Sequence, residues 1–323
     1  MAPAYTRHML HRIKDASDPQ ARPFLDYCGA HGTEHDESYI PGLSWAYGED
    51  FPSFALLDDH GTVCGAAAAM MGPSFRAARR ARIAILHACG EPSVEAYGSM
   101  VSAVAAALDE AADTIYLFLP ENNAALIAVL ARLGFKLERT ACLMLAKPSA
   151  PAVAILPAGY RIVPLARDIG LDIAEFVAVR NRNFREVKGS VDTRPEDLAE
   201  FIDSDEFLPG GLMLVVAPDG KACGTLRVER DDEEGSTFIG TISVDREHRG
   251  KGLARALIRS ALAFSRDSGF GKAFLSVNAD NTKALDLYRK EGFSIVKAMS
   301  CLTANPASLV NLRLDDPACG RGT

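Results

Sequence analysis

The clearest pattern of apolar and polar positions lies in the second half of the chain, where strand-like runs come first. Apolar runs at residues 212–217 and 222–228 flank a Pro-Asp-Gly turn, which predicts a β-hairpin. A β-branched run at residues 237–244 predicts a third strand. We therefore expect the second half of the chain to contain a sheet that begins with strands adjacent in sequence.

The pattern changes to helical spacing after Gly252. Apolar residues then recur along one helical stripe and stop before Ser268, which predicts a helix that ends there. Another strand is predicted at residues 272–277 and another helix at residues 282–290. Strand, glycine loop, helix, strand and helix in this order predict a crossover unit with a parallel pair of strands.

An internal repeat relates this region to the first half of the chain. Residues 123–135 (NAALIAVLARLGF) align with residues 281–293 (NTKALDLYRKEGF) at an offset of 158, and Asn, Gly and Phe coincide. The pair Cys64-Gly65 matches Cys223-Gly224 at an offset of 159. The repeat predicts a duplicated domain, with domains at residues 1–150 and 155–305, a Pro- and Ala-rich linker at 147–159 and a tail at 306–323.

The composition is that of a folded chain with room for two domains, because its 323 residues are 48% hydrophobic and 24% charged. The net charge of −7 provides no general attraction to nucleic acid or anionic lipid, so neither is an expected partner. No apolar run approaches the about 20 residues that span a bilayer, and the first residues lack the apolar core of a secretory signal. Seven scattered cysteines without a Cys-x-x-Cys pair favour reduced thiols, and we expect a cytoplasmic protein.

The segment at residues 245–254 (DREHRGKGLA) carries the candidate chemistry. It joins a predicted strand to a predicted helix, where unpaired N–H groups at the positive end of the helix dipole can bind phosphate. Gly250 and Gly252 allow close approach and backbone conformations barred to larger residues, and Arg249 and Lys251 add positive charge. A tight strand-to-helix connection without a ligand is the alternative interpretation.

These residues resemble a known family. The string Arg249-x-x-Gly252-x-Ala254, followed by Asn281-x-x-Ala284-x-x-Leu287-Tyr288-x-x-x-Gly292-Phe293, is similar to the GNAT superfamily of N-acetyltransferases. The resemblance is specific over residues 238–293 and looser over 160–228. Through the repeat it extends to the first half, so the chain resembles tandem GNAT proteins of the general type to which mycothiol synthase belongs. It implies an α/β (α+β) fold of two domains, each a mixed, centrally splayed sheet flanked by helices.

The resemblance also implies acetyl-CoA as the donor substrate. Its pyrophosphate would bind the backbone amides of six consecutive residues, Arg249, Gly250, Lys251, Gly252, Leu253 and Ala254. The exposed backbone around Ile242 and Val244 would bind the pantetheine and the thioester carbonyl, with Asn281 beside the cofactor arm. Tyr288 matches the family's general acid, which protonates the departing thiolate, and its phenol of pKa about 10 is protonated at neutral pH. A core aromatic on a helix face is the structural alternative for Tyr288.

We therefore predict an acetyl-CoA-dependent N-acetyltransferase that acts on a primary amine of a small molecule or peptide and needs no metal. Direct attack fits best, because no cysteine occupies a matched position for a covalent acyl intermediate. Many family members carry a glutamate on the strand before the loop, whereas residues 238–244 contain no carboxylate or histidine. Candidates for the base are Glu186, Glu229 and His248. None of the three has a residue pattern that marks it as a base, so two alternative functions remain. One is a noncatalytic acetyl-CoA-binding regulatory module, and the other is a structural tandem scaffold without a cofactor.

The first half lacks these features at an offset of 158. There, the loop residues Arg249, Gly250, Gly252 and Ala254 are replaced by Glu91, Pro92, Val94 and Ala96, and Tyr288 is replaced by Leu130. A glutamate would repel a pyrophosphate and a proline removes a backbone donor. The apolar stripe of the following helix is kept, so we expect a folded but noncatalytic first domain.

Other features of the sequence carry less weight. The family places a helix and loop that cover the substrate at residues 180–188. His31-x-x-x-His35, with Glu34, Asp36 and Glu37 nearby, has ligand-type residues but no helical periodicity, so we predict no metal site. The basic run at residues 76–82 is interpreted as a solvated connection between strands rather than a surface for an acidic partner.

Overall fold

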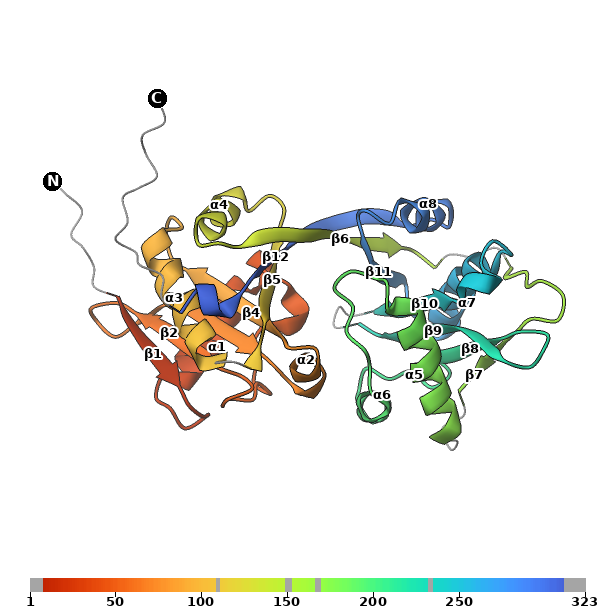
Figure 1. Ribbon diagram of the computed structural model, residues 1–323, viewed down its shortest axis with the longest axis horizontal. Helices are drawn as coiled ribbons and strands as arrows, with labels where there is room; N and C mark the ends of the chain where they lie inside the picture. The colour runs from red at the N-terminus through yellow and green to blue at the C-terminus, as the bar shows by residue number, and fades with distance from the viewer. Residues whose placement is uncertain (1–7, 109–110, 149–152, 166–169, 232–234, 311–323) are drawn as a thin grey trace, which may run out of the picture. The chain divides into compact units, whose positions relative to one another are not determined.

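The computed structural model describes residues 8–108, 111–148, 153–165, 170–231 and 235–310. The chain forms two compact units, which we call unit 1 (residues 1–139 and 299–323) and unit 2 (residues 140–298). Each unit contains a mixed sheet between helices (Figure 1). The predicted fold class of two similar α/β domains is confirmed.

The sheet of unit 2 contains the predicted hairpin and the predicted parallel pair. Its strand order is β6-β11-β10-β9-β8-β7, in which β10 and β11 run parallel and the other neighbours antiparallel. The bounds are β6 (Lys136–Ala146), β7 (Arg161–Pro164), β8 (Leu212–Val216), β9 (Ala222–Arg230), β10 (Ser236–Val244) and β11 (Lys272–Asn278). The predicted strands therefore agree with the observed ones to within two residues.

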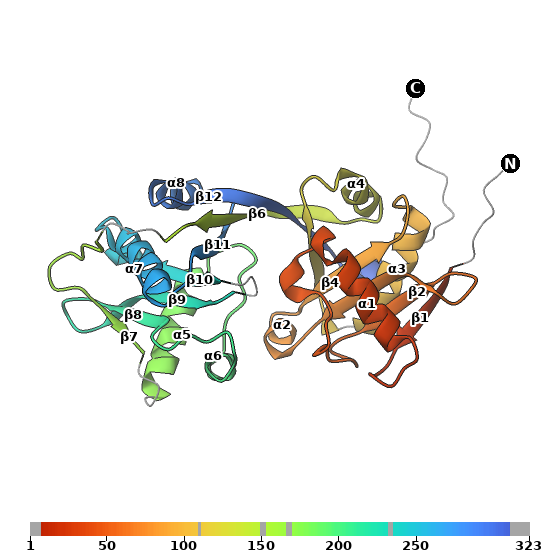
Figure 2. The same cartoon turned by 180° about the vertical axis from the view of Figure 1, so that it is seen from behind.

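Two helices cover opposite faces of this sheet. α5 (Gly170–Phe184) lies in front of the sheet in Figure 1, and α7 (Leu253–Asp267) lies in front of it in Figure 2. The apolar stripe of α7 packs on β9, β10 and β11, as its sequence pattern predicted. The remaining helices of the unit are α6 (Pro195–Ile202), the 3-10 turn η4 (Arg246–His248) and α8 (Thr282–Lys290).

Unit 1 repeats this arrangement with strand order β1-β2-β3-β4-β5-β12. Its strands are β1 (Met9–Ile13), β2 (Ser53–Leu57), β3 (Val63–Met70), β4 (Arg80–Ala88), β5 (Thr114–Pro120) and the second part of β12 (Ser294–Ala304). Its helices are α1 (Ala21–His31), α2 (Pro73–Ala77), α3 (Val94–Leu108) and α4 (Ala124–Arg132), with 3-10 turns η1 (Gly32–Glu34), η2 (Glu37–Tyr39) and η5 (Pro306–Ser308).

The repeated Cys-Gly pairs have the same structural role in both units. A Cβ atom at Gly65 would lie 2.9 Å from the carbonyl oxygen of His87, and one at Gly224 would lie 2.5 Å from that of Ser243. Glycine is therefore needed at both positions because the neighbouring strand approaches closely. α4 and α8 begin 158 residues apart, and β3 and β9 159 residues apart, in agreement with the repeat in the sequence.

The compact units do not end where the repeat placed the domain boundaries. Residues 141–146 of β6 pair with β11 of unit 2, and residues 299–304 of β12 pair with β5 of unit 1. Each copy therefore contributes its last strand to the sheet of the other unit. The expected tail at residues 306–323 begins with a packed segment, because Leu309 is fully buried in the core of unit 1.

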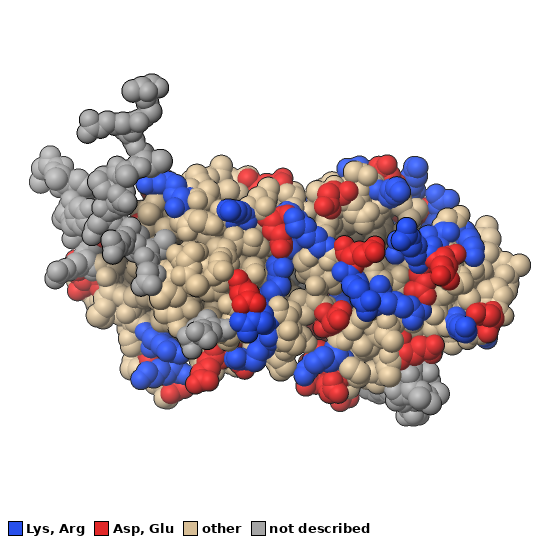
Figure 3. Space-filling view, in the orientation of Figure 1, with Lys and Arg blue, Asp and Glu red and all other residues tan. Residues whose placement is uncertain are grey.

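The basic run at residues 76–82 is solvated as expected at residues 76–79, but its end is buried. It ends α2 and begins β4, and Arg82 is buried beneath the ring of Tyr39 and paired with Asp36. On the face drawn in Figure 3, residues of both charge signs are interspersed. None of the helices in the described ranges has the length and apolarity that a membrane crossing requires.

Candidate functional site

The parallel strands of unit 2 separate after a short paired segment. Among the described residues, β10 pairs with β11 only from Ser236 to Phe238, whereas its other edge pairs with β9 as far as Val244. The backbone edge around Ile242 and Val244 therefore has no neighbouring strand on the side of β11. The carbonyl oxygen of Val244 accepts a hydrogen bond from Arg249 Nε at 2.9 Å. Unit 1 has the same splay, because β4 pairs with β5 over three residues.

A β-bulge lies where the strands begin to separate. The register of β10 against β9 shifts between Ile239 and Thr241, which leaves Gly240 as the extra residue. A Cβ atom at Gly240 would lie 2.6 Å from Arg227 Nη2 and 2.8 Å from Glu229 Oε1. The side chains of Arg227 and Glu229 therefore lie directly over the bulge.

Glu229 is the only one of the three candidate bases that is buried, with 7% of its surface exposed. Its carboxylate forms an ion pair with Arg227, with Nε and Oε2 2.8 Å apart. Burial raises the pKa of Glu229 to about 7, and the nearby guanidinium of Arg227 opposes the shift only in part. A pKa of about 7 is close to the value at which a general base works best near neutral pH.

The loop between β10 and α7 has the geometry of an anion site. Gly250 and Gly252 have φ angles of 78° and 85°, in the left-handed region that favours glycine, and a Cβ atom at either would meet open space. The N–H groups of residues 250–254 have no hydrogen-bond acceptor among the described residues, and the first bond of α7 runs from Ala256 N to Gly252 O. Five backbone donors thus converge at the positive end of a helix.

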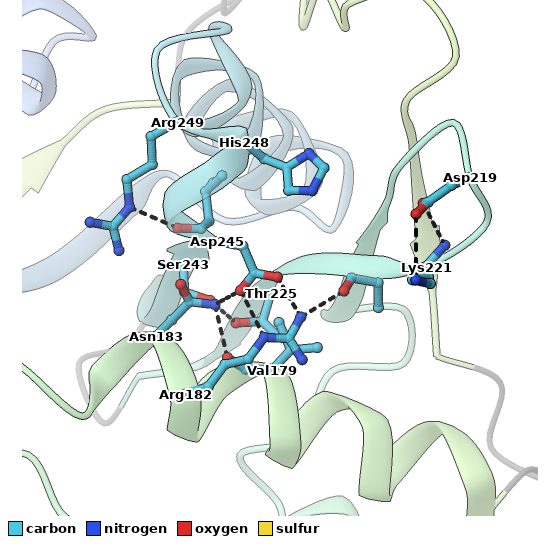
Figure 4. A network of polar contacts seen from close by, with 12 residues as sticks. Val179, Arg182, Asn183, Asp219, Lys221, Thr225, Ser243, Asp245, His248 and Arg249 are labelled. Atoms are coloured by element: carbon cyan, nitrogen blue, oxygen red, sulfur yellow. Dashed lines mark hydrogen bonds and ion pairs between the residues drawn. The ribbon is translucent and has the colours of Figure 1, made fainter.

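Asp245, which the sequence analysis missed, holds the start of this loop. Its carboxylate accepts hydrogen bonds from Arg182 Nε at 2.8 Å and Asn183 Nδ2 at 2.6 Å, both at the end of α5 (Figure 4). Its own N–H donates to the carbonyl oxygen of Cys223 at 2.7 Å. An aspartate between a strand and a glycine loop gives no sequence signal for this role, because its partners are 62 and 63 positions away.

Tyr288 lies on α8, and Asn281 immediately precedes this helix. Burial raises the pKa of Tyr288 to about 12, and its ring packs on the unit 2 core near Phe293. Its phenolic oxygen has no hydrogen-bond partner within the described segments. Asn281 caps α8 by accepting a hydrogen bond from Ala284 N at 3.2 Å, and the equivalent Asn123 caps α4 in the same way. Helix capping thus accounts for the repeated asparagine in both copies.

The other two candidate bases lie elsewhere. Glu186 is exposed in the turn after α5. His248 Nδ1 is 2.8 Å from the hydroxyl oxygen of Tyr160, which also accepts a hydrogen bond from Lys251 Nζ at 3.1 Å. The segment after α5 reaches the end of β11, where this strand has separated from β10. There, Asn278 Nδ2 donates to the carbonyl oxygen of Lys188 at 3.3 Å.

The corresponding loop of unit 1 is shorter. Residues 89–93 connect β4 to α3, whereas residues 245–252 connect β10 to α7, so three residues and the η4 turn are missing. The helix starts are 159 residues apart, which corrects the alignment made at 158. The counterparts of Arg249, Gly250, Gly252 and Ala254 are therefore Gly90, Glu91, Ser93 and Glu95. The shorter loop contains Glu91, and Glu95 follows in the first turn of α3, so we still expect no pyrophosphate to bind there.

The histidine-rich segment of unit 1 is divided by the fold. His35 turns inward, where its Nε2 is 3.0 Å from the carbonyl oxygen of Leu86, and Asp36 pairs with Arg82. His31 and Glu34 instead meet His87 of β4, which the sequence did not connect with them. Burial lowers the pKa of His87 to about 4.

Comparisons with known proteins agree with this geometry. The model of the acetyltransferase (GNAT) family matches residues 176–293. This chain is 31% identical to a mycothiol acetyltransferase of Pseudarthrobacter chlorophenolicus over 145 residues, and this segment covers 44% of each chain. It is 31% identical over 195 residues to a mycothiol acetyltransferase of Nocardia farcinica (56% of this chain, 61% of the relative). It is 34% identical over 113 residues to a streptothricin acetyltransferase of Streptomyces lavendulae (35% of this chain, 58% of the relative). The chain thus matches about half the length of these relatives.

Solved structures share the fold over nearly the whole chain. A GCN5-related N-acetyltransferase from Sphaerobacter thermophilus has a TM-score of 0.67 at 17% identity, covering 93% of this chain and 96% of its own. A tandem GNAT protein from the clavulanic acid biosynthesis pathway has the same TM-score and identity, covering 93% of this chain and 99% of its own. The fold of this chain is therefore one that solved structures already show, among them a protein described as a tandem GNAT.

Proposed function

We propose that this protein transfers an acetyl group from acetyl-CoA to a primary amine by direct attack, at a single site in unit 2. The match of residues 176–293 to the acetyltransferase (GNAT) family supports this proposal. The observation that carries the proposal is the loop at residues 245–254, where free N–H groups, two glycines of positive φ and two basic residues meet beside an unpaired strand edge. The relatives named for mycothiol and streptothricin acetylation support a small-molecule acceptor, and a peptide amine fits the same chemistry.

The donor would bind along the loop and the open edge of β10. A pyrophosphate on the amides of six residues, Arg249, Gly250, Lys251, Gly252, Leu253 and Ala254, would satisfy the five donors of residues 250–254 that have no acceptor in the described segments. The N–H of Arg249 already donates to the carbonyl oxygen of Arg246 and would have to be shared. The pantetheine arm would then extend along β10, where the free backbone edge around Ile242 and Val244 offers hydrogen bonds. Asn281 would lie near the arm while it continues to cap α8. With the pyrophosphate at the loop and the arm running back along β10, the thioester would lie near the bulge at Gly240.

Glu229 is our choice for the general base. It lies over the bulge, and its pKa of about 7 is close to the pH at which the enzyme would work. The burial that raises this pKa also keeps water away from the carboxylate. The proton that Glu229 accepts would then come from the amino group of the acceptor rather than from water. Arg227 holds the carboxylate in place and prevents its pKa from rising further.

The reaction balances with Tyr288 as the acid. The amine nitrogen attacks the thioester carbonyl, the C–N bond forms and the C–S bond breaks, Glu229 accepts the proton from nitrogen, and Tyr288 donates one to the thiolate. Its raised pKa keeps the phenol protonated at neutral pH. A thiolate in the same apolar surroundings is a stronger base than in water, which brings the two pKa values closer together. The products are an N-acetyl amine and free CoA.

Two measurements separate this proposal from the alternatives. Titration calorimetry with acetyl-CoA distinguishes a cofactor-binding protein from a structural scaffold, and thiol release across a panel of amines distinguishes an enzyme from a noncatalytic regulatory module. We expect one acetyl-CoA per chain and thiol release with at least one amine. Two acetyl-CoA molecules per chain, or none, would contradict a single site in unit 2. We further propose that the protein acts in the cytoplasm.

A further inference from the structure

Three metal-type ligand groups come together in unit 1, outside the proposed active site. A ring nitrogen of His31, a carboxylate oxygen of Glu34 and a ring nitrogen of His87 all lie within 4.8 Å of one another. His31 Nδ1 is 3.0 Å from Glu34 Oε1, and His87 Nε2 is 3.3 Å from Glu34 Oε2. A tetrahedral zinc ion with bonds of about 2.0–2.1 Å separates its ligand atoms by about 3.3 Å. Each nitrogen–oxygen distance, one to either oxygen of the Glu34 carboxylate, is therefore close to the ligand spacing of a metal site.

The surrounding structure holds these side chains from three elements. α1 packs on the sheet of unit 1 through Phe24 and Cys28, and its last residue is His31 (Figure 2). The 3-10 turn η1 then brings Glu34 beside it, and His87 is the last residue but one of β4. The imidazole rings stack at a centroid distance of 4.0 Å, and a nitrogen of each lies beside the carboxylate of Glu34.

Tyr27 supplies the outer contact that metal-bound histidines have. Its hydroxyl donates to the carbonyl oxygen of Cys64 at 3.0 Å, and its oxygen is 2.7 Å from His87 Nδ1. In this arrangement the hydroxyl oxygen accepts the Nδ1 proton, so the unprotonated Nε2 points at the carboxylate of Glu34. Two acceptors at that distance repel each other unless a cation lies between them.

We propose that His31, Glu34 and His87 bind one divalent transition metal ion in unit 1. Two imidazoles and one carboxylate are the ligand types that zinc accepts, with a fourth position left for water. The ion would link α1 and η1 to β4 and so stabilise unit 1, whose shortened loop cannot bind a pyrophosphate. The site uses none of the residues proposed for acetyl transfer, so its existence is independent of the proposed function.

Zinc titration of the full-length chain tests the proposal. The protein, with any affinity tag removed and after treatment with a chelator, is titrated by calorimetry, and its thermal unfolding is followed with and without zinc. We expect one zinc ion per chain and a higher unfolding temperature when it is bound. Cobalt(II) in the same site is expected to give the visible absorption of tetrahedral coordination.

Substitutions locate the ion. Glu34→Gln and His31→Asn should abolish the single binding event, and Glu34→Gln should fold because its side chain is 44% exposed. Tyr27→Phe keeps all three ligands and should weaken zinc binding about 10- to 100-fold. His11→Asn is the matched control, since His11 also contacts a carboxylate, that of Asp18 at 3.0 Å, but has no second histidine.

The outcomes are distinct. Loss of zinc binding in the ligand variants, with full binding in His11→Asn, supports the site. No saturable binding by the wild-type chain, or binding that remains in both Glu34→Gln and His31→Asn, overturns it. In that case the proton of His87 is on Nε2 rather than Nδ1, and Glu34 accepts hydrogen bonds from both imidazoles.

Discussion

Replacing Glu229 by Gln should change two quantities that can be measured separately, the pH dependence of stability and the turnover. In wild type, the folded protein holds the Glu229 proton more tightly than the unfolded chain, because burial raises its pKa from 4.5 to about 7. Stability is then fully present below about pH 4.5 and falls as pH rises to about 7, since the folded state must ionise a buried carboxyl. The amide of Gln has no charge to ionise, so the variant should lack this part of the pH dependence.

The magnitude follows from the two pKa values. One pKa unit corresponds to 1.36 kcal/mol, so the shift makes wild type lose about 2 to 3 kcal/mol more than Glu229→Gln between pH 5 and pH 8. Little solvent screening reduces this value, because the residue is 7% exposed. Over the same range, turnover by wild type should rise with pH through about 7, and turnover by the variant should be lower by at least about 10²-fold.

Urea unfolding at pH 5 and pH 8, followed by circular dichroism, measures the stability difference without knowledge of the acceptor. Glu186→Gln is the matched control, since Glu186 is exposed and should change neither quantity. A difference below about 1 kcal/mol between wild type and Glu229→Gln would mean that the pKa of Glu229 is not raised, and our reasoning for the base would fail. Full activity of the variant would remove Glu229 from the mechanism even if the stability difference were found.

Three further predictions concern the same site. Gly252→Glu should abolish acetyl-CoA binding measured by calorimetry, because it places a negative side chain at the pyrophosphate position. Ser93→Glu at the matching position of unit 1 should leave acetyl-CoA binding intact, and the reverse result would exchange the roles of the units. Tyr288→Phe should keep acetyl-CoA affinity but lower turnover by about 10²-fold or more, and unchanged turnover where chemistry limits the rate would exclude it as the acid. Asp245→Ala removes the carboxylate that accepts hydrogen bonds from Arg182 and Asn183, so we expect lower thermal stability of unit 2, by about 1 kcal/mol because the pair with Arg182 is partly exposed, and weaker cofactor binding. A variant as stable as wild type would contradict the anchoring role.

Local interactions made much of the fold predictable from the sequence. The hairpin, the helix after Gly252 and the glycines of the loop depend on residues close in sequence, and their patterns predicted the elements to within two residues. The repeat likewise predicted two similar units, because equal spacing of equal patterns produces equal folds. The domain boundaries could not be obtained in this way, because pairing of β6 with β11 and of β12 with β5 depends on which strand edges are open.

The chemistry of individual side chains depended on contacts between distant segments. The sequence could name Glu229 as one of three candidate bases, but its raised pKa comes from burial over the bulge at Gly240. The sequence grouped His31 with His35, whereas the fold brings His31 to His87, 56 positions away, and turns His35 to the backbone of β4. Sequence alone determined where strands, helices and the glycine loop form, because backbone hydrogen bonding and side-chain periodicity act over a few residues. Only the tertiary structure decided which polar groups are desolvated together, because desolvation and charge act through space between residues that the chain separates.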